Sequence, residues 1–141
     1  MTASPRTPFS AEHSGVYRTP QDMNLLRQAA ARVGIAFFVV DIARAKDKED
    51  FLAACATALE FPRGFGGNWD AFADCVQDLS WHAARGYVIH LQDAAGFARA
   101  VPQDYATAIE ILRYAADYWR ERGTGFLALV DDALELPAFA P

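Results

Sequence analysis

Residues 35–42 read IAFFVVDI, an almost uninterrupted run of β-branched, aromatic and other apolar residues. Such a run is typical of a strand that is buried on both faces, as the strands of parallel sheets are. Two further segments have the same character, GYVIHLQDA from Gly86 and FLALV at 126–130. Helical patterns separate the three segments, and parallel strands need such crossover connections. The sequence therefore predicts an α/β fold with a small three-stranded parallel sheet.

About four helices are expected to pack on this sheet. The segment KDKEDFLAACATALEF, residues 46–61, places apolar residues on one helical stripe, and Asp47 can cap it. Asn68 is a good cap for the next helix. A short helix is expected around residues 95–101 and a long one over residues 103–122.

The two ends of the chain differ from this middle part. Residues 1–18 are polar and contain two prolines, so we expect a loose arm there. A helix should follow, with Thr19 as its cap, Pro20 in its first turn and Gly34 at its end. The expected organisation is an N-terminal arm and helix over 1–34, one domain over 35–131, and a loose tail over 132–141. A chain of 141 residues suits a single domain with a real core.

Composition excludes several classes of protein. The net charge of -5 argues against a nucleic-acid partner, because phosphate binding needs concentrated Lys and Arg, and it suits basic partners or simply solubility. No apolar stretch reaches about 18 residues, so no membrane span is expected. The N-terminus lacks the pattern of a secretory signal. Cys55 and Cys75 are too few for a disulfide framework and lack metal-site spacing, which favours a reducing cytoplasm and no cofactor.

Residues 65–79, FGGNWDAFADCVQDL, carry an unusual charge pattern. Asp70, Asp74 and Asp78 recur every fourth residue, and the stretch contains no Lys or Arg. On a helix these carboxylates lie roughly opposite an apolar stripe that includes Phe72 and Val76. The pattern predicts a helix that is held down by its apolar face and carries unneutralised acids on the other face.

Three interpretations of the acidic face stay open from spacing alone. It can be an ordinary solvated face, because like charges at this spacing cost only about 0.2–0.5 kcal/mol per pair. It can be a contact surface for a basic partner, whose cations would relieve the repulsion. A metal site is the weakest of the three, because oxygen-ligated metals usually draw their ligands from a loop or from several elements.

The loop and helix together resemble the signature of the barstar family of ribonuclease inhibitors. The similar stretch is FPRGFGGNWDAFADC, residues 61–75, and the order of strands and helices over about 35–130 is also similar. The matching positions are Pro62, Phe65, Gly66, Asn68, Asp70, Ala71, Asp74 and Cys75. The resemblance implies a barstar-like fold and a protein inhibitor rather than an enzyme.

The resemblance also implies how such an inhibitor would act. The loop and the following helix would block the active site of a basic ribonuclease, barnase-like or another toxin nuclease, with carboxylates in the place of substrate phosphates. Asp74 would be the central anion and Asp70 its support, while Gly66 would let the loop backbone approach closely. The expected partner-binding residues are Phe65, Gly66, Asn68, Trp69, Asp70, Asp74, Asp78 and Asp117. The role would be that of a cytoplasmic antitoxin or immunity protein.

Three departures from the family pattern leave an alternative open. Gly64 stands where the family has a contact tyrosine, and Arg63 stands where it has an acid. The late-helix glutamate of the family falls at Tyr118, with Asp117 beside it. Barnase itself is therefore not assured as the partner, and the alternative is a barstar-fold interaction module for a partner that is not a nuclease. A metal protein or an enzyme using the aspartates and a histidine is a third hypothesis, and the oligomeric state is left open.

Other reactive residues fit structural roles better than catalytic ones. His90 lies inside an apolar strand segment, and no serine or cysteine stands at a diagnostic spacing from any histidine. Cys75 shares the apolar stripe of its helix and is expected to be a core residue, as is Cys55.

Overall fold

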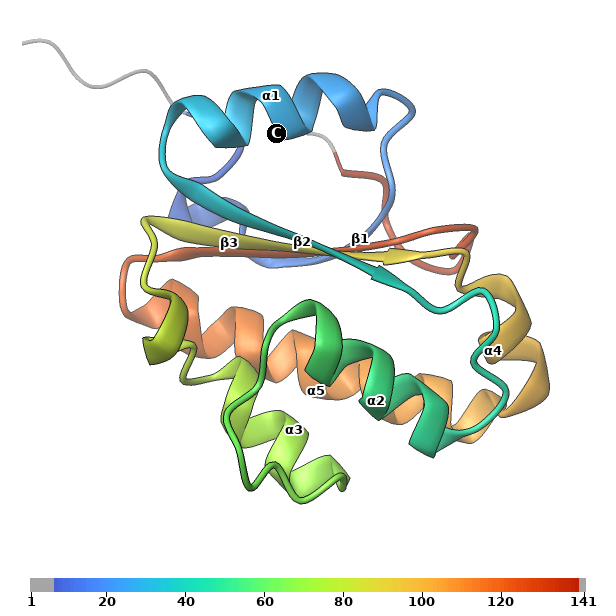
Figure 1. Cartoon of the computed structure of the whole chain (residues 1–141). Coiled ribbons are helices and arrows are strands. Elements are labelled where there is room, and N and C mark those ends of the chain that lie inside the picture. The colour runs from blue at the N-terminus through green and yellow to red at the C-terminus, as the bar shows by residue number, and fades with distance from the viewer. Residues whose placement is uncertain (1–6, 140–141) are drawn as a thin grey trace, which may run out of the picture.

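A four-stranded parallel sheet forms the centre of the molecule in a computed structural model that describes residues 7–139. The strands stand in the order β1-β4-β3-β2 (Figure 1). Their bounds are β1 Gly15–Arg18, β2 Ile35–Asp41, β3 Gly86–Gln92 and β4 Gly125–Val130. Residues 1–6 and 140–141 lie outside the described residues, so the loose arm and tail expected at those positions stay predictions.

Helices cover both faces of the sheet, α1 on one face and the other four α-helices of the described part on the opposite face (Figure 1). The chain crosses the sheet from β1 to β2 in one direction and returns through β3 to β4 in the other. Right-handed crossovers in opposite directions place their helices on opposite faces. The bounds are α1 Met23–Arg32, α2 Lys48–Ala58, α3 Trp69–Val76, α4 Ala95–Ala100 and α5 Pro102–Glu121, with short 3-10 turns η1 Ala11–His13 and η2 Ser80–His82.

The core has two layers because neighbouring side chains along a strand point to opposite faces. In β3, Tyr87, Ile89 and Leu91 belong to the large core against α2–α5. Val88 belongs to the smaller core against α1, together with Leu26 and other residues. The expected burial on both faces is confirmed for two strands, because every residue of β4 and all but the last of β3 are buried. It is wrong for β2, which lies at an edge of the sheet and has only Phe38 and Val40 buried.

The sheet has four strands rather than the three expected. The additional strand, β1, lies in the segment predicted to be a loose arm, and it pairs in parallel with β4 from Gly15 opposite Leu127 to Arg18 opposite Val130. It has only four residues, of which Val16 alone is buried, so it has no apolar run to reveal it. Short edge strands of this kind are common, since they leave little backbone open to other chains.

The tail is also packed, contrary to the expectation of a loose end. Ala133 and Leu136 are each only 2% exposed. The Arg18 amide donates to the Pro137 carbonyl at 2.8 Å, and Ala138 forms an isolated parallel bridge with Arg18. Residues on both sides of 35–131 therefore extend the same sheet and core, while the division of the chain at residues 34 and 131 stays a prediction.

The start of α1 differs from the expectation by three residues. Asp22, not Thr19, caps the helix, because its carboxylate accepts from the Leu25 amide at 3.1 Å. Thr19 instead donates its hydroxyl to the Asp131 carboxylate at 2.7 Å. The predicted caps of α2 and α3, Asp47 and Asn68, are confirmed.

Candidate partner-binding surface

Helix α3 is fixed at its start and along one face. The side-chain oxygen of Asn68 accepts from the Ala71 amide at 2.8 Å, which satisfies one of the free donors at the helix start. Phe72 and Val76 are buried in the large core. Because this face is held against the protein, the opposite face of the helix points outward.

Asp70 and Asp74 are exposed on that outward face, one turn apart. Neither carboxylate has an ion pair or hydrogen bond with any of residues 7–139. Asp70 lies in the first turn, where the helix dipole favours a negative charge. Asp74 lies beyond the reach of that effect, so no interaction inside the described chain accounts for its charge.

Asp78 does not continue the helix as the spacing predicted, because α3 ends at Val76. Its carboxylate accepts from the Ser80 amide at 3.3 Å in the turn that follows. The next residue, Leu79, has a left-handed backbone with φ 53° and a fully buried side chain. Leu79 thus takes the left-handed conformation that glycine often supplies after a helix, so no glycine marks the end of α3. Asp78 therefore has a local structural role as well as a place near the other acids.

Two glycines shape the loop before α3. Gly64 has φ 90° and Gly67 has φ 65°, conformations that side chains with a Cβ rarely adopt. Gly66 was the glycine singled out from the sequence, but its φ is not left-handed. A Cβ on Gly66 would instead lie 3.1 Å from the side-chain nitrogen of Asn68, so this glycine leaves room for the helix cap.

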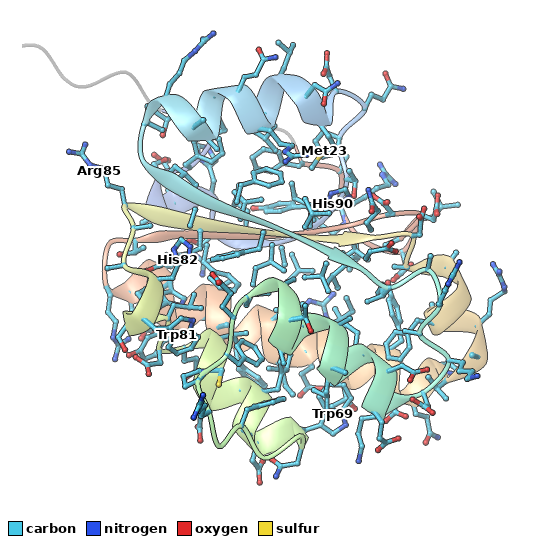
Figure 2. All side chains as sticks on the ribbon, viewed as in Figure 1. Met23, Trp69, Trp81, His82, Arg85 and His90 are labelled. Carbon is cyan, nitrogen blue, oxygen red and sulfur yellow. The ribbon has the colours of Figure 1, made fainter. Side chains whose placement is uncertain are left out.

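The two aromatic residues of the predicted surface pack partly inward. Phe65 meets Phe61 edge to face, with ring centres 4.9 Å apart. Trp69 lies at the start of α3, with its ring centre 5.8 Å from that of Phe51 in α2 and 5.9 Å from that of Phe72 (Figure 2). Both residues are half-buried and hold the loop and α3 against the core, while part of each stays accessible.

The loop and α3 form the walls of a shallow, open hollow of about 210 Å³. Pro62, Arg63, Gly64, Phe65 and Gly66 line it from the loop, and Ala71, Asp74 and Cys75 line it from the helix. Burial raises the pKa of the Cys75 thiol, and the charges of Asp74 and Asp78 raise it further. Cys75 was expected to be a core residue, but it is only partly buried and lines this hollow. The structure thus brings the predicted loop residues and Asp74 together in one concave surface.

Asp117 is not part of this surface. Its carboxylate pairs with Arg120 at 2.7 Å, and the Arg120 guanidinium also donates to the Ser14 carbonyl. Asp117 lines a different hollow, beside the first residues of β1. Trp119 is on the side of α5 that faces α3, and its indole N–H donates to the Val76 carbonyl at 2.8 Å. Since Asp117 lies two residues before Trp119, it projects from nearly the opposite side of α5.

A polar cluster at another edge of the sheet was missed entirely. The Asp131 carboxylate accepts from His90 at 2.8 Å, from the Thr19 hydroxyl and from the Asp93 amide at 2.9 Å. His90 lies on the α1 side of the sheet (Figure 2). These residues come from distant parts of the chain and meet only because the ends of β1, β3 and β4 lie together. All three donors are satisfied by one carboxylate, which gives the cluster a structural role.

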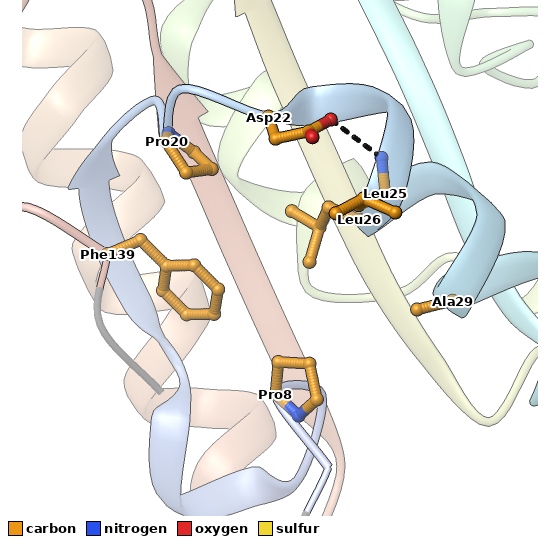
Figure 3. A pocket seen from close by; sticks show the side chains of 7 residues that line it. All are labelled: Pro8, Pro20, Asp22, Leu25, Leu26, Ala29 and Phe139. Carbon is orange, nitrogen blue, oxygen red and sulfur yellow. Dashed lines mark hydrogen bonds between the residues drawn. The ribbon is translucent and has the colours of Figure 1, made fainter.

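A second hollow lies on the α1 side of the sheet and is almost entirely apolar (Figure 3). It measures about 310 Å³ and is lined mainly by side chains of α1, the preceding segment and Phe139.

Within the part of the chain that the structure describes, no group of three or more His, Cys, Asp or Glu side chains could hold a metal ion. No described helix is long and apolar enough to cross a membrane.

Comparison with known proteins agrees with the fold and with the loop and helix just described. A search of curated proteins found no match to the chain. The model of the family described as Barstar (barnase inhibitor) matches residues 35–131, which is more than half of the chain and includes β2, β3, β4 and the whole loop–α3 surface. The chain therefore belongs to the barstar family.

Proposed function

We propose that this protein inhibits a basic ribonuclease by covering its active site with the loop of residues 62–67 and helix α3. It would act as an antitoxin or immunity protein in the cytoplasm and would not be an enzyme itself. Family membership supports this proposal. The observation that carries it is the exposed, unpaired Asp74, with Asp70 one turn before it.

The chemistry of a ribonuclease active site fits such a surface. An enzyme that cleaves RNA must hold phosphates, and it does so with Arg, Lys and other donors. Carboxylates accept charge-assisted hydrogen bonds from the same groups. On α3 they are carried by a helix whose buried face fixes their position, so little conformational freedom is lost on binding.

The test is a capture experiment from extracts and culture medium of the host. The wild-type chain and the Asp70→Asn, Asp74→Asn double variant serve as baits, and mass spectrometry identifies the proteins that only the wild type retains. We expect a basic ribonuclease among them. Asn keeps the shape of Asp, and both positions are exposed, so the two baits should have the same melting temperature.

A matched control uses Glu110→Gln, which removes an exposed carboxylate from α5 that has no ion pair or hydrogen bond among the described residues. This variant should retain the ribonuclease. If the double variant and the wild type retain the same proteins, α3 is not the contact surface and the proposal fails.

The alternative is an interaction module for a partner that is not a nuclease. It is favoured by Arg63, a cation exposed on the same hollow as Asp74. It predicts that the protein lost from the double variant has no nuclease activity.

A further inference from the structure

Strand β1 leaves part of one edge of the sheet open. It stands at the end of the strand order, so β4 covers only one of its sides. The Thr19 amide donates to the Val130 carbonyl at the end of β4, whereas the Arg18 amide donates to the Pro137 carbonyl of the tail. Successive residues along a strand in a parallel sheet thus turn their backbone groups to opposite sides. By the same alternation, Val16 turns its amide and its carbonyl away from β4.

The outward backbone groups of Val16 have no partner among the described residues. No hydrogen bond within residues 7–139 reaches its amide or its carbonyl from the side opposite β4. The tail occupies this edge at Arg18, where Ala138 forms its isolated parallel bridge. The edge therefore already accepts one extended segment, and the place beside residues 14–17 is open to another.

A hollow of about 310 Å³ lies at this open place. It is lined by residues 14–17, by Pro137 where the tail begins to pair with β1, and by one face of α5. The volume is many times the roughly 30 Å³ that one water molecule occupies in the liquid. The hollow therefore has room for part of an extended segment of another chain, which would add to the sheet through its backbone.

The α5 side of this hollow carries an uncompensated positive charge. Arg113 lines the hollow, is exposed, and forms no ion pair or hydrogen bond with any described residue. Arg120 lines it as well, but the Asp117 carboxylate at 2.7 Å balances its charge. An acidic group that entered the hollow would therefore meet Arg113 as a free cation.

Glu135 is the acid that could neutralise Arg113 from within the chain. The two residues share a neighbouring hollow, but they form no ion pair. The Glu135 carboxylate instead accepts from the Tyr105 hydroxyl at 2.6 Å. Arg113 thus stays available to a carboxylate from outside.

The direction of the Val16 side chain decides which face of an added strand would meet Arg113. Val16 points into the large core on the α5 side of the sheet, whereas Tyr17 packs against the smaller core on the α1 side. Residues directly opposite each other on neighbouring strands point to the same face. The residue of an added strand that lies opposite Val16 would therefore turn its side chain to the α5 side, where a carboxylate complements the charge of Arg113.

We propose that the open edge of β1 binds an extended acidic segment of a partner protein. The segment would pair with the Val16 amide and carbonyl as a further strand, and an Asp or Glu opposite Val16 would meet Arg113. This surface is separate from α3, and β1 precedes residues 35–131, which the family model matches. The protein would then have a second contact surface, selective for a partner of the opposite charge to the one that α3 suits.

The test uses the capped peptide acetyl-Thr-Val-Glu-Val-Thr-amide, whose alternation places Glu on one face and both Val residues on the other. It is titrated into the full chain while amide NMR shifts and hydrogen exchange are followed. We expect saturable shifts at residues 14–18 and 113–120, and slower exchange at the Val16 amide in the complex. The Tyr17 amide is the internal reference, because it faces β4, and its exchange should not change.

A matched peptide and two variants of the chain test the charge. The peptide with Gln in place of Glu should bind about two- to five-fold more weakly, which is the range expected for one exposed ion pair. Arg113→Gln should still bind the peptide but lose the preference for Glu over Gln. Arg99→Gln, which removes an exposed cation from α4, is the control and should keep the preference.

Three results would overturn the inference. They are the absence of saturable shifts at the β1 edge, exchange at Val16 that the peptide does not slow, and equal binding of both peptides by the wild type. Slower exchange at Val16 with rising protein concentration and no peptide would overturn it too, because the edge would then belong to a contact between two copies of the chain. None of these measurements involves α3, so their outcome is independent of that of the capture experiment.

Discussion

At the scale of single residues, Asp131 links three strand ends through one carboxylate. Burial alone would raise the pKa of Asp131, but hydrogen bonds from the Asp93 amide, His90 and Thr19, with the charge of His90, lower it below its usual value of 3.8. Because the folded pKa lies below the unfolded one, the stabilisation is complete above the usual value. It is lost as the pH falls through the folded pKa.

Asp131→Asn should therefore lower the free energy of unfolding at neutral pH, by about 1–3 kcal/mol, because Asn carries no charge and offers one acceptor oxygen where the carboxylate offers two to the donors of the cluster. The difference from the wild type should shrink as the pH falls below about 4. Urea unfolding across this pH range measures it. The neighbouring Asp132→Asn is the control, since Asp132 is exposed and Asn tolerates its left-handed backbone. Equal effects of the two substitutions at every pH would rule out the cluster as a source of stability.

The helix caps show which contacts of single residues can be predicted from the sequence and which cannot. Asn68 and Asp47 were predicted as caps because a cap bonds an amide only three residues ahead, so the signal is local. Thr19 has an equally good side chain for capping, but its hydroxyl donates instead to the carboxylate of Asp131, 112 residues away along the chain. A local sequence pattern cannot show that Asp131 competes with the helix start for the Thr19 hydroxyl.

At the scale of elements, the short helix α3 depends on its cap. Its eight residues are too few to be stable alone in water. Asn68→Ala should reduce the free energy of unfolding by about 0.5–2 kcal/mol, because the Ala71 amide loses its acceptor. Chemical denaturation checks this value, and amide exchange should quicken at residues 70–72 before it quickens in the sheet.

Asn68→Asp is the matched control, because the carboxylate keeps an acceptor in place and suits the helix dipole. This variant should be at least as stable as the wild type. A loss of stability equal to that of Asn68→Ala would show that the cap does not hold α3.

The elements also explain the differences between the expected and the observed fold. Strands β2, β3 and β4 were predicted because they carry apolar runs, which are typical of parallel strands, although β2 proves to lie at one edge of the sheet. Strand β1 lies at the edge and buries Val16 alone, so its pairing with β4 follows from tertiary structure only. Asp117 was assigned to the contact surface from its position in the chain, but the rotation of α5 pairs it with Arg120.

At the scale of the whole molecule, the N-terminal segment is built into the sheet. The Ser14 hydroxyl accepts from the Phe126 amide at 3.0 Å, so this segment bonds directly to β4. A Cβ on Gly125 would overlap the backbone carbonyl of Phe9, which no side-chain movement could relieve. Gly125 therefore permits the segment around Phe9 to lie against β4.

Gly125→Ala should displace this segment and lower the free energy of unfolding by about 1–3 kcal/mol, the range for overpacked interiors. Faster amide exchange in β1, with a lower melting temperature, would report the displacement. Gly96→Ala in α4 is the control: its Cβ would lie 3.7 Å from the nearest atom, and Ala favours a helix. If Gly125→Ala leaves both the stability and the exchange in β1 unchanged, the segment is not held as described.

RNA cleavage by the captured ribonuclease is the measurement that tests α3 as an inhibitor surface. The chain is added in increasing amounts while the cleavage rate is followed. We predict that the rate falls to zero at one equivalent of wild type. Asp74→Asn should need about ten- to a hundred-fold more protein, as loss of a charged hydrogen bond implies. A complex that forms while RNA is still cleaved at the full rate would show that α3 does not cover the active site.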